Sequence, residues 1–86
     1  MTRIKLDQVH ALAWSPERGR RLARIREFTP RRVVCERAAE SGLHLTEVNL
    51  TRIETLNAES VPLTTLAAIA AGLRKDLPAL LKELGF

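Results

Sequence analysis

The chain has 86 residues, of which 45% are hydrophobic and 3% aromatic, and its formal net charge is +4. This length suits one domain that buries about 60–65% of its unfolded surface, so dimerisation would add to a thin stability margin. The single cysteine, Cys35, excludes an intrachain disulfide, and no apolar run suits a membrane span or a signal peptide, so we expect a cytoplasmic protein without a membrane anchor.

The N-terminal part of the chain gives the least regular pattern. We expect residues 1–14 to form a separate N-terminal segment and residues 15–86 to form the domain. Apolar spacing favours a short helix over residues 7–14, and alternating apolar residues nearer the start suggest an edge strand as the alternative. Trp14 is expected in the core or at an interface.

The first two helices are predicted from their start signals. Ser15, Pro16 and Glu17 supply an N-cap, a proline at the first helical position and an acid in the first turn, and they predict a helix that runs to about residue 28. Thr29 followed by Pro30 repeats the signal. The second helix is expected to fade out at residues 41–42.

Similar signals predict three more helices. Thr46 is placed as the N-cap of a third helix, and residues 60–62 are expected to open a fourth, which Gly72 ends. Asp76 is expected to cap a last helix over residues 77–84. Five helices with short connections and no strand pattern predict an all-α, compact five-helix bundle.

The arginines are concentrated in residues 18–37. Eight arginines and two glutamates give this segment a net charge of +6, so the rest of the chain is slightly acidic. Such a segment on a small domain is typical of a protein that binds a polyanion, and a solvated helix face is the alternative explanation.

Four short motifs resemble one family of DNA-binding domains. They are Arg24-Ile25-Arg26-Glu27, Leu50-Thr51-Arg52-Ile53-Glu54, Leu66-Ala67-Ala68-Ile69-Ala70-Ala71-Gly72-Leu73 and Asp76-Leu77-Pro78-Ala79-Leu80-Leu81. Their order and spacing resemble the Cro/C1-type helix-turn-helix family, also called the Xre family, over roughly residues 18–84. The resemblance implies a lambda-repressor-like fold with a helix-turn-helix, and an ion pair between Arg26 and Glu54 that joins the first helix to the third.

Two registers are open for the turn before the third helix. An ungapped comparison places His44 where the family usually has glycine, and Glu40 where it usually has a small residue. A shifted register places Gly42 in the turn and Ala38 in the second helix. We use the ungapped register to assign contacts.

In that register the third helix enters the major groove of double-stranded DNA. The predicted base-reading residues are Glu47, Val48, Asn49, Thr51 and Arg52. Arg52 can bind guanine through two hydrogen bonds, Asn49 can pair with adenine, and Val48 can pack on a thymine methyl. Glu47 can accept a hydrogen bond from cytosine, but it repels phosphate unless it pairs with a base or with Arg52. The predicted phosphate-binding residues are Thr46, Arg21, Arg24, Arg31, Arg32 and Arg37.

The last helix offers more apolar side chain than we expect the fourth helix to cover. Its apolar residues are Leu77, Leu80, Leu81, Leu84 and Phe86. Exposed patches of this kind usually mark an interface, so we expect a homodimer or a protein partner to use them.

These features predict a sequence-specific DNA-binding transcriptional regulator of the repressor type. The alternative is a helix-turn-helix fold used for protein interaction, such as an antitoxin or phage protein that binds a toxin, a polymerase or a larger complex. The arginines favour DNA, whereas Glu47 and Val48 on the reading face favour a protein partner.

We predict no enzymatic activity, metal or cofactor. His10, His44 and Cys35 are too scattered in the sequence to suggest a metal site, and Cys35 has no basic partner at a useful spacing. The sequence contains no Gly-rich phosphate loop and no pattern that indicates a paired-carboxylate pocket.

Overall fold

The computed structural model describes residues 11–55 and 58–86, which form five helices and a two-stranded antiparallel sheet. The elements are β1 (Ala11–Ala13), α1 (Pro16–Ile25), α2 (Arg31–Glu40), α3 (Glu47–Thr55), β2 (Ser60–Pro62), α4 (Leu63–Gly72) and α5 (Leu77–Glu83). The prediction of a compact, mostly helical fold is confirmed. The prediction that it is all-α is wrong, because of the small sheet.

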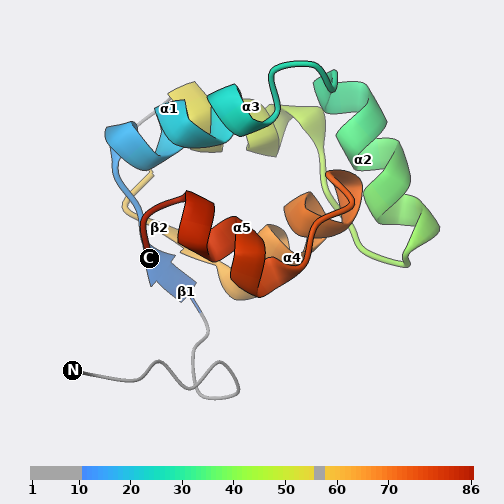
Figure 1. Ribbon diagram of the computed structural model, residues 1–86. Helices are drawn as coiled ribbons and strands as arrows, with labels where there is room; N and C mark the ends of the chain where they lie inside the picture. The colour runs from blue at the N-terminus through green and yellow to red at the C-terminus, as the bar shows by residue number, and fades with distance from the viewer. Residues whose placement is uncertain (1–10, 56–57) are drawn as a thin grey trace.

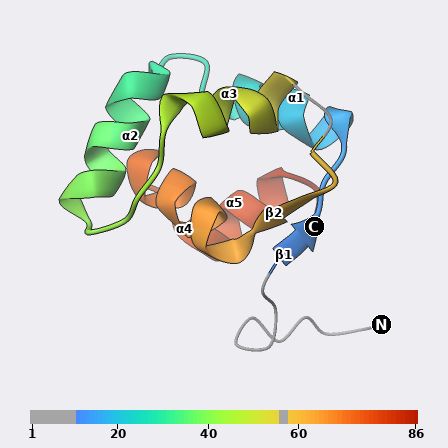
Figure 2. The ribbon, with the colours of Figure 1, turned by 180° about the vertical axis from the view of Figure 1, so that it is seen from behind.

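The helices form two layers that α2 closes at one end (Figure 1). α1 and α3 pack together in one layer, and α4 and α5 in the other, as the view from behind also shows (Figure 2). Aliphatic side chains from every helix and from β2 fill the core between them. The largest fully buried side chains are those of Leu22, Val34, Leu50, Ile53, Val61, Leu66, Ile69, Leu80 and Leu84.

The sheet joins the segment before α1 to the segment before α4. Leu12 pairs with Val61 at its centre, and both side chains are buried, while the neighbours of each along the strand are exposed. This alternation is the burial pattern of a strand with one face on the core. The helix expected over residues 7–14 is therefore wrong for Ala11–Ala13, and residues 7–10 lie outside the described residues.

The segment Ser60–Pro62 was expected to open the fourth helix and instead forms β2. Pro62 is the last residue of β2 and also the N-cap residue of α4, with an extended ψ of 142°, so the helix begins only at Leu63. Because the partner strand lies about 50 residues earlier in the chain, local cap signals give no sign of this pairing.

The predicted helix starts have different outcomes. The N-cap at Ser15 is confirmed, because its Oγ accepts a hydrogen bond of 3.2 Å from the backbone N–H of Arg18. The prediction that Thr29 caps the second helix is wrong, since Pro30 occupies that position without a side-chain hydrogen bond. Asp76 is the N-cap residue of α5, but its side chain forms no capping bond.

Gly42 ends α2 in a left-handed conformation, with φ of 77°. The N–H of Gly42 donates to the carbonyl of Ala39, and the N–H of Leu43 donates to that of Ala38, both at 2.9 Å. This is the Schellman pattern, in which glycine is favoured at the left-handed position. The residue in the left-handed conformation after α2 is therefore Gly42, as in the shifted register, and not His44.

The prediction that the fourth helix ends at Gly72 is confirmed, although Gly72 itself does not adopt a left-handed conformation. The left-handed residue after α4 is Arg74, with φ of 57°. Gly72 is needed for another reason: a Cβ there would collide with the carbonyl and side chain of Val34 on α2. Its missing side chain lets α4 approach α2 closely.

Within the described residues, no helix combines the length and the apolar character required to span a bilayer.

Candidate nucleic-acid interface

The predicted reading helix, α3, begins as expected. The backbone N–H of Asn49 donates to Oγ1 of Thr46 at 3.1 Å, which confirms Thr46 as the N-cap. Because this hydroxyl satisfies one of the free N–H groups of the first turn, the helix starts at a fixed residue. The connection between α2 and α3 is short and places the two helices in different directions (Figure 1).

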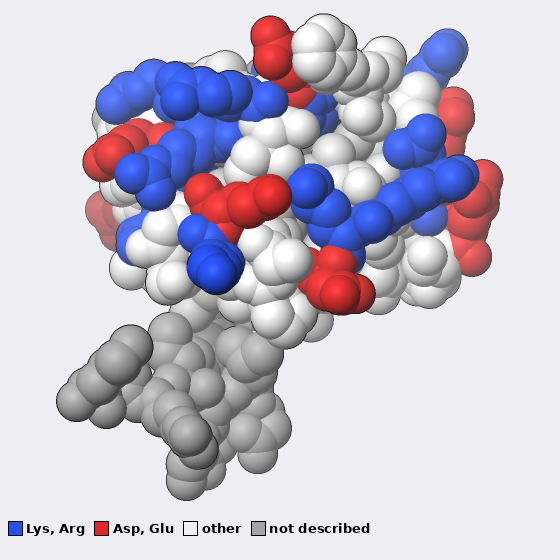
Figure 3. Space-filling model, viewed as in Figure 1, with Lys and Arg blue, Asp and Glu red and all other residues white. Residues whose placement is uncertain are grey.

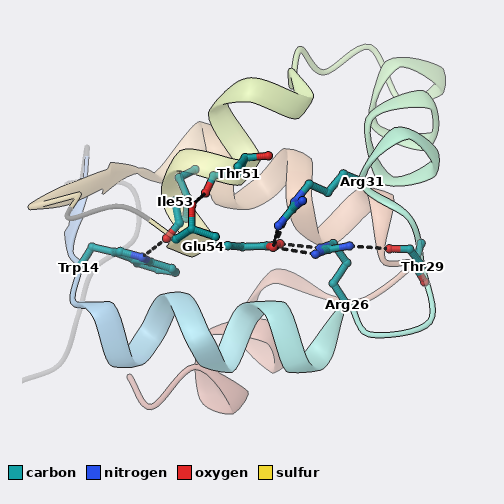
Figure 4. A network of polar contacts seen from close by, with 8 residues as sticks. Trp14, Arg26, Thr29, Arg31, Thr51, Ile53 and Glu54 are labelled. Atoms are coloured by element: carbon teal, nitrogen blue, oxygen red, sulfur yellow. Dashed lines mark hydrogen bonds and ion pairs between the residues drawn. The ribbon is translucent and has the colours of Figure 1, made fainter.

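The inner face of α3 contains a buried carboxylate, Glu54, whose side chain has no exposed surface. Arg26 donates to both of its oxygens, through Nε at 2.5 Å and Nη2 at 2.7 Å, and Arg31 donates to Oε1 from Nη2 at 2.9 Å (Figure 4). Arg26 also donates to the carbonyl of Thr29 at 3.1 Å. The expected ion pair between Arg26 and Glu54 is confirmed, and the second arginine was not foreseen from the sequence.

Two further contacts fix the C-terminal turn of α3. The indole Nε1 of Trp14 donates to the carbonyl of Ile53 at 3.0 Å in a buried setting, so Trp14 is a core residue. On α1, a Cβ at Gly19 would lie 2.7 Å from the Ile53 carbonyl oxygen and 2.8 Å from that of Glu54. Only glycine permits this approach of the two helices. The orientation of α3 therefore depends on α1 and on Trp14, in the segment before α1.

The outer face of α3 carries the predicted base-reading residues in an exposed position. Glu47, Val48 and Arg52 are exposed, and Val48 retains 81% of its accessible surface. Asn49 and Thr51 are half-buried. Counted at about 100° per residue, the five spread over about 200° around α3, with Val48 and Arg52 farthest from the buried side and Glu47 at its edge. We call the surface formed by these five residues the reading face.

Two side chains of the reading face are bonded to each other. Arg52 donates from Nε at 3.2 Å and from Nη2 at 3.0 Å to the same oxygen, Oδ1 of Asn49. Among the described residues, Glu47 forms no ion pair with Arg52. Its charge instead acts on the thiol of Cys35, which belongs to α2. Burial, and then the negative charges of Glu47 and Glu36, raise the pKa of the Cys35 thiol.

The predicted phosphate-binding arginines do not form one surface. Arg31 is committed to Glu54, and Nη1 of Arg37 donates to the carbonyl of Gly72 at 3.3 Å, which ties α2 to α4. Arg32 is 73% exposed and lies 3.7 Å from Glu36. It is the arginine of α2 that is most available to an external phosphate.

The arginines of α1 face away from α3. Counted at about 100° per residue, Arg20, Arg21 and Arg24 lie between about 100° and 200° around the helix from Gly19, which touches α3. Within their layer, α1 lies in front of α3 in Figure 1 and behind it in Figure 2. Figure 3 shows basic side chains over α1 with acidic side chains among them, and Arg21 is paired with Glu17 at 3.2 Å. The prediction that these arginines act with the reading face is therefore not supported by the geometry.

The predicted leucine interface is largely internal. Leu80 and Leu84 are fully buried, and Leu81 retains 8% of its surface, because these side chains complete the core beside α4. Leu77 and Phe86 are half-buried against the same core. Phe86 also stacks under Arg18, whose guanidinium carbon lies 3.9 Å from the ring centre. The expectation that α5 leaves a leucine surface uncovered is thus wrong.

The described residues contain no group of three or more potential metal ligands. A hollow of about 220 Å³ is lined by Ser15, by charged side chains of α1 and by Leu84 and Gly85. Ligand pockets usually measure about 300–1,000 Å³ and are mostly apolar.

Comparisons of the chain with protein-family models, with curated proteins and with solved structures found no match.

Proposed function

We propose that this protein is a non-enzymatic, sequence-specific DNA-binding regulator of the repressor type, in which α2, the turn at Gly42 and α3 act as a helix-turn-helix. The observation that carries the proposal is the contrast within α3: its inner face is locked by buried contacts, and its reading face presents hydrogen-bonding side chains to solvent. A helix of this kind fits the major groove, where base edges are distinguishable.

Phosphate contacts in this proposal come from the elements next to the reading face. Thr46 and the N-terminus of α3 can receive one phosphate, and Arg32 a second. Arg31 retains 32% side-chain exposure, so it can contact a phosphate while it remains bonded to Glu54. The arginines on the exposed face of α1 are not required.

Fluorescence anisotropy with a labelled random-sequence duplex, at about 50 and 200 mM salt, tests this arrangement. Arg32→Ala should weaken binding to all duplexes alike and reduce the salt slope by about 1. Arg24→Ala is the matched control, because it removes an exposed arginine from the side of α1 that faces away from α3 and should change binding little. Absence of binding by the unaltered protein at about 50 mM salt would overturn the proposed function.

Two exposed apolar side chains favour a second candidate function, a protein-interaction module. Phe28, in the connection after α1, is 92% exposed, and Val48 on the reading face is 81% exposed. Two results together would support this second function. The unaltered protein would bind no duplex at low salt, and Phe28→Ser would abolish binding to a protein partner that the unaltered protein binds.

A homodimer belongs to the same proposal, because operators read by helix-turn-helix proteins usually have two-fold symmetry. Of the interface predicted from the sequence, Leu77 and Phe86 keep part of their surface exposed. Light scattering coupled to size-exclusion chromatography measures the mass directly, and a monomer at concentrations that bind DNA would contradict this part.

A further inference from the structure

The reading face contains a pair of side chains whose arrangement limits what each can recognise. Oδ1 of Asn49 accepts hydrogen bonds from both Nε and Nη2 of Arg52, at 3.2 and 3.0 Å. Reading adenine with asparagine requires the amide oxygen to accept from the adenine amino group while the amide nitrogen donates to N7. Because the oxygen of Asn49 is already used, Asn49 acts on Arg52 and not on a base.

The bonds to Asn49 leave a defined part of the guanidinium free. Arginine has five N–H donors, and the two directed to Asn49 leave three, on Nη1 and the far side of Nη2. This edge, with N–H groups on both Nη1 and Nη2, can bind O6 and N7 of guanine through two parallel hydrogen bonds. Holding the side chain in advance also reduces the rotamer entropy lost when it binds.

Val48 lies four residues before Arg52, on the same side of α3, and is 81% exposed. Side chains at this spacing are neighbours about 5–6 Å apart. Stacked base pairs are about 3.4 Å apart, so the two side chains reach base pairs that are adjacent or nearly so. Val48 offers no hydrogen bond, and the thymine methyl is the apolar group of the major groove that it can contact.

We propose that the reading face recognises a guanine through Arg52, which Asn49 positions, together with the methyl group of a thymine within two base pairs of that guanine, which Val48 contacts. This inference rests on the proposed function, since it requires that α3 enter the major groove.

In vitro selection from a random duplex library, followed by anisotropy on the selected site, tests the inference. The selected site should contain the guanine and the nearby thymine. Replacing that guanine with adenine should weaken binding by the unaltered protein about 10- to 100-fold. Replacing the thymine with uracil removes only the methyl group and should weaken binding about 3- to 10-fold.

Variants assign the two effects to their residues. Arg52→Ala should abolish the preference for guanine, and Val48→Ala should make binding insensitive to the change from thymine to uracil. Asn49→Ala should reduce the guanine preference at least about fivefold, with random-duplex affinity little changed. Asn49→Asp keeps an acceptor for Arg52 and should restore the preference, although the added charge weakens binding to all duplexes.

Thr55→Ala is the control, because Thr55 is exposed on α3 and its hydroxyl bonds within the helix to the carbonyl of Thr51. It should leave both preferences unchanged. Selection of a site in which Asn49→Ala removes an adenine preference would overturn the inference, as would a guanine preference that survives Arg52→Ala. Either result leaves the proposed function intact, whereas the absence of any duplex binding overturns the proposed function itself.

Discussion

The inner and outer faces of α3 each place an arginine beside an oxygen acceptor, in different surroundings. On the inner face, Arg26 meets the buried carboxylate of Glu54, and the charges of the pair are largely removed from water. On the outer face, Arg52 meets the neutral amide of Asn49 and keeps its full charge in solvent. Similar hydrogen bonds therefore stabilise the fold on one face and leave an exposed cation on the other.

The largest effect should come from removing the inner acceptor. Glu54→Ala leaves Arg26 and Arg31 without their shared carboxylate, with side-chain exposures of 14% and 32%. Loss of one partner from a buried ion pair costs about 3–5 kcal/mol of unfolding free energy. Urea denaturation measures the loss, with the exposed Glu27→Ala as control. A loss below about 1 kcal/mol would show that the inner face does not depend on this carboxylate.

The next largest effect should come from the contact between α1 and α3. In Gly19→Ala the new methyl group would lie within 2.8 Å of two carbonyl oxygens of α3, so the helices must separate. Overpacking of this kind costs about 1–3 kcal/mol, against the small gain that alanine usually brings to a helix. Thermal unfolding followed by circular dichroism checks the loss, and Arg20→Ala at the adjacent exposed position is the control. Unchanged or increased stability would disprove the close approach.

Substitution on the outer face should separate binding from stability. Arg52→Ala removes an exposed side chain bonded to a neutral partner, so the unfolding free energy should change by less than about 0.5 kcal/mol. The same variant should lose its preference for guanine. A stability loss comparable to that of Glu54→Ala would break the distinction between the two faces.

The smallest effect concerns the N-terminal end of the reading face. Burial and then Glu47 raise the pKa of Cys35, so little thiolate is present at neutral pH. Glu47→Gln removes the charge and lowers the pKa, so it should measurably speed alkylation by iodoacetamide at pH 8, although burial, the larger cause of the raised pKa, remains. Glu40→Gln should leave the rate unchanged. An unchanged rate in Glu47→Gln would indicate that Glu47 faces away from α2.

Much of the helical framework was predictable because its signals are local. The caps at Ser15 and Thr46 follow from residues within one turn of each helix start. The ion pair between Arg26 and Glu54 followed from the family resemblance. These features account for the correct order of the five helices.

Most of the errors and omissions have a different physical origin, because they depend on a partner distant in the sequence. Val61 is in a strand since it pairs with Leu12, and Gly72 is small since Val34 lies against it. Arg31 points to Glu54 rather than outward. The leucines of α5 are buried by a core whose volume could not be judged from one helix at a time.

The most direct test of the account is an NMR titration of the isotope-labelled protein with a selected duplex. The largest amide shift changes should fall on residues 46–52 and on the start of α2. Exposed residues of α1 such as Arg20 and Arg24 should change little, because they face away from α3. Changes concentrated on the exposed face of α1, with residues 46–52 unaffected, would contradict the assignment of α3 as the reading helix.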